Sequence, residues 1–97
     1  MGHDISGYKI TDKENEIAYL GRNAYDGLNV EIYNSLNCLH CSGGVSGNGS
    51  EMDFTKEELL KALEYLGDNE NLEPERKFVK DCLENIDEDS KILVRFY

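Results

Sequence analysis

Long hydrophobic runs are missing from this chain of 97 residues, and basic residues are scarce. No stretch approaches the roughly 20 apolar residues that a membrane-spanning helix needs, and the N-terminus shows no apolar segment typical of a secretory signal. Ten basic residues against 20 acidic ones leave a net charge of −10. Such a surface repels nucleic-acid phosphates and anionic lipid. We therefore expect a soluble, cytoplasmic protein that binds neither membranes nor nucleic acids directly.

Cysteine is also sparse, with residues only at Cys38, Cys41 and Cys82. An odd number of cysteines in a chain without a secretory signal argues against a disulfide framework. We expect free thiols, and Cys82 falls on the apolar stripe of a predicted helix, where cysteine acts as a small hydrophobic residue.

The length allows one hydrophobic core, so residues 1–97 are predicted to form a single domain. Apolar residues make up 39% of the chain, which is typical of a globular protein. Acids and bases are unevenly spread along the chain. The half from residue 51 onward carries 14 acids and seven bases, which gives it a net charge of −7 out of the total of −10. This charge has two interpretations, simple solvation or an acidic face that meets a basic partner surface.

Regular structure is predicted from the spacing of apolar residues. Two apolar runs around a polar turn predict a β-hairpin, and apolar residues at every third or fourth position predict helices. The strands are expected at 4–10, 16–22 and 91–97, the helices at about 28–36, 55–67 and 74–86, and a turn at 87–90.

Local signals support several of these boundaries. Asn29 stands where it could cap the first helix and Asn37 where it could end it. Thr55 and Glu58 have the spacing of a capping box, and Gly67 favours the left-handed turn that ends a helix. The second strand has apolar side chains on both faces, so an inner strand is expected. Five tyrosines are expected to anchor the core: Tyr8, Tyr19, Tyr25, Tyr33 and Tyr65.

The order β-β-α-loop-α-α-β predicts an α+β fold. We expect a small antiparallel sheet, made of the N-terminal hairpin and the C-terminal strand, packed against about three helices. The long irregular segment 38–50 interrupts this pattern, and loops of that length in a compact domain are often functional.

Cys38, His40 and Cys41 form the strongest chemical motif of that loop. Two thiolates at this spacing can chelate one Zn²⁺, and His40 adds a nitrogen ligand, but structural zinc takes four ligands and the chain offers no second pair of this kind. A redox pair would stand at the start of a helix, whereas this one follows a helix. Zinc remains an alternative rather than the leading expectation.

The glycine-rich part of the loop contains Gly43, Gly44, Ser46 and Gly47. Such loops can cradle an anion with backbone N–H groups, although neither the Walker A nor the dinucleotide pattern is present. His3 and Arg22 should face each other across the hairpin, so the predicted ligand site combines these two side chains with the loop. A flexible turn and an ordinary salt bridge of Arg22 are the structural alternatives.

Several short segments resemble a family of small uncharacterised bacterial proteins that begin Met-Gly-His-Asp-Ile. They are residues 2–5, Glu16 to Leu20, Gly43 to Gly47, and Phe54 with Thr55. The resemblance implies an arginine pair after the Tyr-Leu and no Cys-x-x-Cys; here Gly21-Arg22 and the cysteine pair depart from it, which weakens the zinc idea. It implies no activity.

Two functions are therefore left open. The first is a non-enzymatic module, an inhibitor or a regulatory partner, that offers an acidic helical face to a basic protein surface. The second is a site for a small molecule, an anion or a metal, built from His3, Arg22 and residues 38–50. No catalytic set is recognisable, and the oligomeric state is left undetermined by the sequence.

Overall fold

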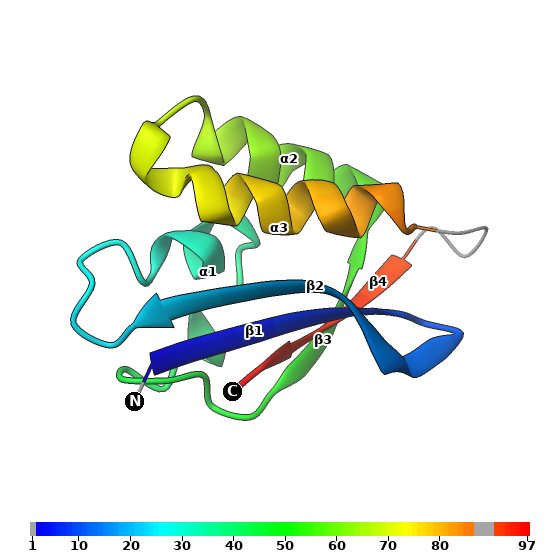
Figure 1. Ribbon diagram of the computed structural model, residues 1–97, viewed down its shortest axis with the longest axis horizontal. Helices are drawn as coiled ribbons and strands as arrows, with labels where there is room; N and C mark the ends of the chain where they lie inside the picture. The colour runs from blue at the N-terminus through cyan, green and yellow to red at the C-terminus, as the bar shows by residue number, and fades with distance from the viewer. Residues whose placement is uncertain (1, 87–90) are drawn as a thin grey trace.

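The computed structural model describes residues 2–86 and 91–97, so the turn expected at 87–90 lies outside the described residues. Within the described residues, four antiparallel strands form one sheet in the order β2-β1-β4-β3, and the helices gather on one side of it (Figure 1). This confirms the α+β prediction. The elements in chain order are β1 (Gly2–Lys9), β2 (Asp12–Asn23), α1 (Glu31–Ser35), the 3₁₀ turn η1 (Leu39–Cys41), β3 (Glu51–Thr55), α2 (Lys56–Leu66), the 3₁₀ turn η2 (Glu70–Leu72), α3 (Glu73–Glu84) and β4 (Lys91–Phe96).

The sheet places the C-terminal strand beside the N-terminal one. Ile5 of β1 pairs with Leu20 of β2 on one side and with Phe96 of β4 on the other, as expected for a last strand that joins the hairpin. The prediction of β2 as an inner strand is wrong, because β1 is the inner member of the hairpin and β2 lies at the edge. The apolar residues of β2 misled that prediction: Ala18 and Leu20 face the core, whereas Tyr19 lies exposed on the other face.

A fourth strand, β3, was not predicted. It pairs with β4 along its five residues, from Glu51 opposite Arg95 to Thr55 opposite Lys91. Only Phe54 of this strand is fully buried, so its own apolar pattern is too short to identify it. Its pairing partner lies some forty residues later, where local periodicity carries no signal.

Helix boundaries follow the local signals in α2 more closely than in α1. Thr55 accepts from the Glu58 backbone N–H at 3.2 Å and Glu58 accepts from the Thr55 N–H at 3.0 Å, which confirms the capping box. Gly67 ends α2 at a φ of 60°, as predicted. Asn29 does not cap α1: its side chain donates to the Ala24 carbonyl, and the helix begins only after Val30.

The core lies between the sheet and the helices. Ile5, Val94 and Phe96 from the sheet and Leu59 and Phe78 from the helices are buried. Each such side chain stabilises the fold by about 1.5–3 kcal/mol. Among the tyrosines expected in the core, only Tyr8 and Tyr33 are buried; the exposed ones are Tyr19, Tyr25 and Tyr65.

The helices are short as well as amphipathic. None within the described part of the chain combines the length and the apolar composition needed to cross a membrane.

Candidate functional site

The loop that carries the sequence motifs is closely tied to the end of β4. The Gly47 N–H donates to the Tyr97 carbonyl, and the Gly49 N–H donates to the Phe96 carbonyl at 2.8 Å. A Cβ atom on Gly47 would lie 2.7 Å from the Tyr97 carbonyl oxygen and closer still to the Phe96 carbonyl carbon. Glycine is therefore needed at position 47 so that two backbone segments can approach each other.

The backbone N–H groups expected to cradle an anion are bonded within the protein. Gly43 donates to the Ser46 carbonyl at 2.7 Å, Gly44 donates to the Ser42 hydroxyl at 3.2 Å, and Gly47 is held by β4. The Ser46 hydroxyl donates to the Gly47 carbonyl at 3.1 Å. An incoming anion would compete with these bonds, which gives the loop a structural role of its own.

His3 is buried and joins this loop to α1. Its Nε2 lies 3.0 Å from the Gly44 carbonyl oxygen and its Nδ1 lies 2.7 Å from the Tyr33 hydroxyl. Because a carbonyl only accepts, Nε2 donates to Gly44, and Nδ1 is paired with the Tyr33 hydroxyl. The two rings meet edge-on at 5.4 Å. Both nitrogens of His3 are thus already paired.

Cys38, which precedes η1, and Cys41, its last residue, are buried free thiols. Burial raises the pKa of Cys38 far above its ordinary value, and the neighbouring Cys41 thiol adds to this effect. Burial raises the pKa of Cys41 as well. Since the thiolate is the nucleophile and the metal ligand, both cysteines are held in their unreactive protonated form.

The predicted zinc ligands do not gather around one point. His40 is exposed on η1, while the Sγ of Cys41 lies 3.4 Å from the Sδ of Met52 in the interior. Across residues 2–86 and 91–97, no three side chains of His, Cys, Asp or Glu come together as a possible metal site. The cysteine pair offers two sulfur atoms where structural zinc takes four ligands.

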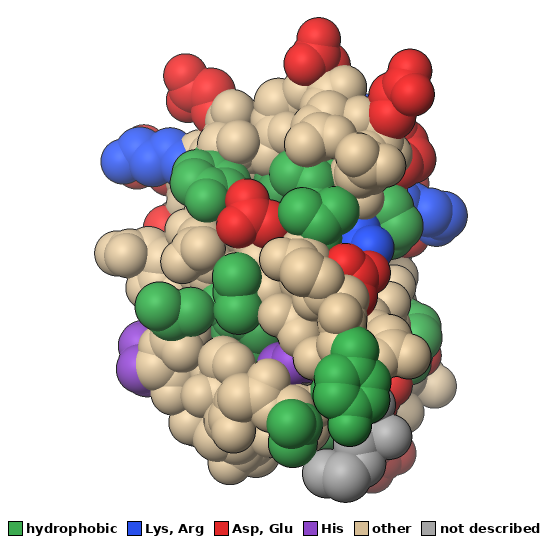
Figure 2. Space-filling view, turned by 90° about the vertical axis from the view of Figure 1, so that its left-hand side faces the viewer, with side chains coloured by type: hydrophobic (Ala, Val, Ile, Leu, Met, Phe, Trp, Pro, Cys, Tyr) green, Lys and Arg blue, Asp and Glu red, His purple; other side chains and the backbone are tan. Residues whose placement is uncertain are grey.

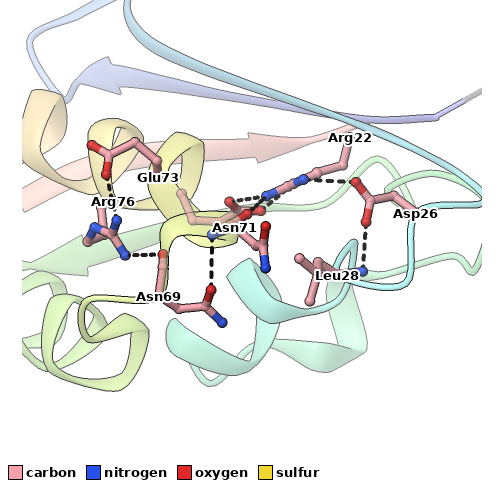
Figure 3. A network of polar contacts seen from close by, with 8 residues as sticks. Arg22, Asp26, Leu28, Asn69, Asn71, Glu73 and Arg76 are labelled. Atoms are coloured by element: carbon pink, nitrogen blue, oxygen red, sulfur yellow. Dashed lines mark hydrogen bonds and ion pairs between the residues drawn. The ribbon is translucent and has the colours of Figure 1, made fainter.

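Arg22 is the centre of a second polar cluster, at the end of β2 (Figure 3). Its guanidinium donates to both carboxylate oxygens of Glu75, at 2.6 Å each, and to Asp26 at 2.8 Å. A further N–H donates to the Asn71 carbonyl oxygen at 2.7 Å. Glu75 is fully buried, so this two-pronged ion pair fastens α3 to the edge strand of the sheet.

The opposite charges of the Arg22 cluster stabilise one another in their ionised forms. Hydrogen bonding to Glu75 raises the pKa of Arg22 above its already high ordinary value. The pKa of Asp26 is lowered by the backbone N–H of Leu28 and then by Arg22. The Arg22 cation is neutralised by two carboxylates, and a ligand anion would have to displace them.

His3 and Arg22 are paired across the hairpin as predicted, but their side chains serve different neighbours. His3 meets the loop at Gly44, whereas the bonds of Arg22 run to the turn after β2 and to η2 and α3. The structure thus brings together His3 with the glycine-rich loop and with Tyr33. The predicted combination of these groups with Arg22 as one ligand site stays a prediction.

A small pocket lies elsewhere, between the end of α1 and α2. Its volume is about 210 Å³ and its lining comprises Ser35, Leu36, Asn37, Glu58 and Lys61. Ligand pockets are commonly about 300–1,000 Å³. Glu58 is engaged in the capping box and the Ser35 hydroxyl donates to the Ile32 carbonyl, so two of the five lining residues already serve the helices.

The end of the molecule where α2 passes into α3 has a different character. Figure 2 shows acidic side chains along its upper rim and hydrophobic side chains below them. We define the acidic end as residues 64–73, which contain four acids and no base. Within the described part of the chain, Glu64, Asp68 and Glu70 are exposed and form no ion pair. Tyr65 of the same segment is half exposed and contacts Glu31 of α1.

Two residues of these clusters were missed in the sequence. Glu75 stands three and four positions before Phe78 and Val79, so it is a charge on an otherwise apolar helix stripe, and that signal could have identified a buried ion pair. Tyr33 lies in the core as predicted, but nothing in its local sequence indicates His3 as the partner of its hydroxyl.

Comparisons with protein-family models, with curated proteins and with solved structures found no match. The function is therefore inferred from the chain itself.

Proposed function

We propose that this chain is a non-enzymatic protein-interaction module, an inhibitor or a regulatory partner, whose acidic surface binds a basic surface of another protein. The observation that carries the proposal is the acidic end, which carries the half-exposed Tyr65 and three exposed carboxylates that form no ion pair with the described residues. Charged residues steer association, and exposed aromatic side chains supply contact area when they are desolvated.

The negative charge at the acidic end stays exposed in the folded protein, whereas several of the other acids in the second half of the chain are buried or paired. Of the fourteen acids after residue 50, Glu75 is buried against Arg22, and Asp87, Glu88 and Asp89 lie outside the described residues. On α3, Lys77 pairs with Asp81 and Arg76 with Glu73. Arg76 also donates to the Gly67 and Asn69 carbonyls, so its cation lies at this end. Glu64, Asp68 and Glu70, which form no ion pair among the described residues, support an interaction surface at the acidic end rather than along the whole helical face.

The loop cysteines and His3 support a structural role in place of catalysis. The pKa values of the two thiols are raised by burial, and both nitrogens of His3 are hydrogen-bonded within the protein. The second hypothesis, a small-molecule, anion or metal site at residues 38–50, has one favourable contact, between His3 and Gly44. We rank it below the interaction module because a ligand would have to replace existing bonds.

The test is capture of partners on the immobilised chain while salt is raised from about 0.05 to about 0.5 M, a range over which exposed charges become screened. The triple variant Glu64→Gln, Asp68→Asn, Glu70→Gln should lose about tenfold or more of the affinity for a captured partner. A matched control removes the same three charges elsewhere, at Asp53→Asn, Glu57→Gln and Glu84→Gln, all exposed.

Equal losses in both triple variants would mean that only net charge matters, and salt-independent binding would contradict the proposal. A rise of the unfolding temperature with Zn²⁺ or phosphate would instead favour the ligand site, because a ligand that binds the folded state stabilises it.

A further inference from the structure

Among the residues that the structure describes, the outer edge of β2 leaves backbone groups unpaired. The Asp4 carbonyl accepts from the Tyr97 N–H at 2.9 Å, so Asp4 directs its backbone toward the C-terminal strand. Because neighbouring residues of an inner strand alternate in direction, His3 and Ile5 direct theirs toward Arg22 and Leu20 of β2. Between them on β2, Tyr19 and Gly21 then direct their N–H and C=O groups away from β1. β2 is the last strand on that side within the described residues.

This part of the edge is open. Tyr19 and Gly21 are both exposed, and exposure of a glycine is exposure of its backbone. The Tyr19 ring lies flat on the open face of the sheet: its hydroxyl donates to Asp4 and would lie 2.9 Å from a Cβ atom on Gly21. No side chain at position 21 stands in the way of an incoming strand.

The first half of β2, residues 12–16, has features that prevent another strand from pairing with its edge. Residues 12–16 contain three acids and one lysine, and the pairing register shifts near Tyr8. Charges and irregular registers are devices that discourage edge pairing. From Ile17 to Asn23 the only charge is that of Arg22, which is bound to Glu75. The edge is thus blocked over one half and open over the half that leads to the acidic end.

Charge indicates what would pair there. Arg22 contacts the Asn71 carbonyl, so the end of β2 touches the acidic end, and Glu14 and Glu16 precede the open half. A strand laid along Tyr19 and Gly21 therefore has Glu14 and Glu16 at one end and the backbone of the acidic end, at Asn71, near the other. A basic segment is attracted by this arrangement, whereas a second copy of this chain would bring another −10 against it.

We propose that the basic partner inferred above inserts an extended segment bearing Lys or Arg, which adds a fifth strand to the sheet at Tyr19 and Gly21 of β2. The inference rests on the proposed function and specifies its partner. Main-chain hydrogen bonds hold such a segment, and its basic side chains set the specificity.

Amide hydrogen exchange followed by NMR tests directly whether an added strand pairs with Tyr19 and Gly21 of β2. In the protein alone, the amides of Leu20 and Arg22 should be protected by β1 while those of Tyr19 and Gly21 exchange fast. The probe is an eight-residue peptide of alternating Lys and Val, added at a concentration on the order of 1 mM. The Tyr19 and Gly21 amides should then slow by about tenfold or more.

Two controls isolate the backbone contact. The same peptide with N-methyl groups along the edge that would face β2 should give no protection, and neither should a peptide of alternating Glu and Val. The Gly21→Pro variant removes an outward N–H while leaving the bonds of Leu20 and Arg22 to β1 in place. With its unfolding temperature measured to confirm folding, it should lose peptide binding.

Several outcomes overturn the strand addition. Peptide-induced shifts confined to the acidic end, with Tyr19 and Gly21 still exchanging fast, would leave the interaction module standing without strand addition. Equal binding of the N-methylated peptide would do the same. A dimer seen by ultracentrifugation and abolished by Gly21→Pro would assign the edge to a second copy. Absence of salt-dependent binding by both the peptide and any captured partner would contradict the proposed function itself.

Discussion

At the residue scale, the contact between Arg22 and Glu75 shows how a single charge can be assigned to a structural role. The guanidinium holds both oxygens of a carboxylate that has no access to water, and it reaches Asp26 and a backbone carbonyl as well. Removing one partner of a buried ion pair leaves an uncompensated charge in the interior, which costs more than the pair contributes.

Arg22→Ala should therefore destabilise the fold by about 3–5 kcal/mol, because it leaves Glu75 buried without a partner. Glu75→Ala should cost less, since Arg22 keeps Asp26 and Asn71. Urea unfolding measures both. The double variant Arg22→Met, Glu75→Leu should recover much of the loss of Arg22→Ala. If Arg22→Ala is as stable as the wild type, the ion pair between Arg22 and Glu75 does not stabilise the contact of β2 with α3.

At the scale of the element, segment 38–50 behaves as a packed loop rather than a flexible linker. Its glycines meet particular requirements: Gly44 and Gly49 adopt φ values of 98° and 85°, and Gly47 allows close approach to the end of β4. The loop also holds His3 through the Gly44 carbonyl. Glycine content that resembles a ligand cradle in the sequence is thus explained by backbone geometry.

Gly47→Ala should destabilise the protein by about 1–3 kcal/mol, because the new Cβ collides with the backbone of Phe96 and Tyr97. Gly27→Ala is the matched control: a Cβ there meets nothing within 4 Å and its φ is not positive, so little change is expected. Thermal unfolding compares the two. Equal effects would mean that the loop is not packed against β4 in this way.

At the scale of the whole molecule, several buried thiol and hydroxyl groups keep their protons to a higher pH than they would in water. Burial raises the pKa of Cys82 from 9.0 to about 12, and burial raises that of Tyr33 from 10.0 to about 12. Burial raises the pKa of Cys38 further still. Above pH 9 the unfolded chain releases thiol protons that the folded chain retains, so rising pH favours unfolding.

The free energy of unfolding should accordingly fall as the pH rises above about 9, by about 2 kcal/mol at about pH 10.5 for each of Cys38 and Cys82. Denaturant titrations at several pH values measure the slope. Cys82→Ala should lower stability at pH 7 by opening a cavity but flatten this alkaline slope. An unchanged slope would contradict the protonation argument.

Thiol-reactive dyes should label the native protein slowly and the denatured chain fast.

The sequence by itself determined the features that depend on neighbouring residues. Periodicity of three to four residues identified α2 and α3, and Thr55 with Glu58 specified a helix start that the structure reproduces. The α+β class followed from the order of these elements. Such features are readable because their stabilising contacts lie within one helical turn or one hairpin.

Only the tertiary structure decided which residues form the clusters and which edge stays open. His3 reaches Tyr33 across 30 positions and Gly44 across 41, and Arg22 reaches Glu75 across 53. β2 became an edge strand because β4 pairs with β1 from the far end of the chain. Contacts of this range depend on how packed elements meet in space, so no local pattern records them, and the unpaired backbone of Tyr19 and Gly21 is a consequence of that packing alone.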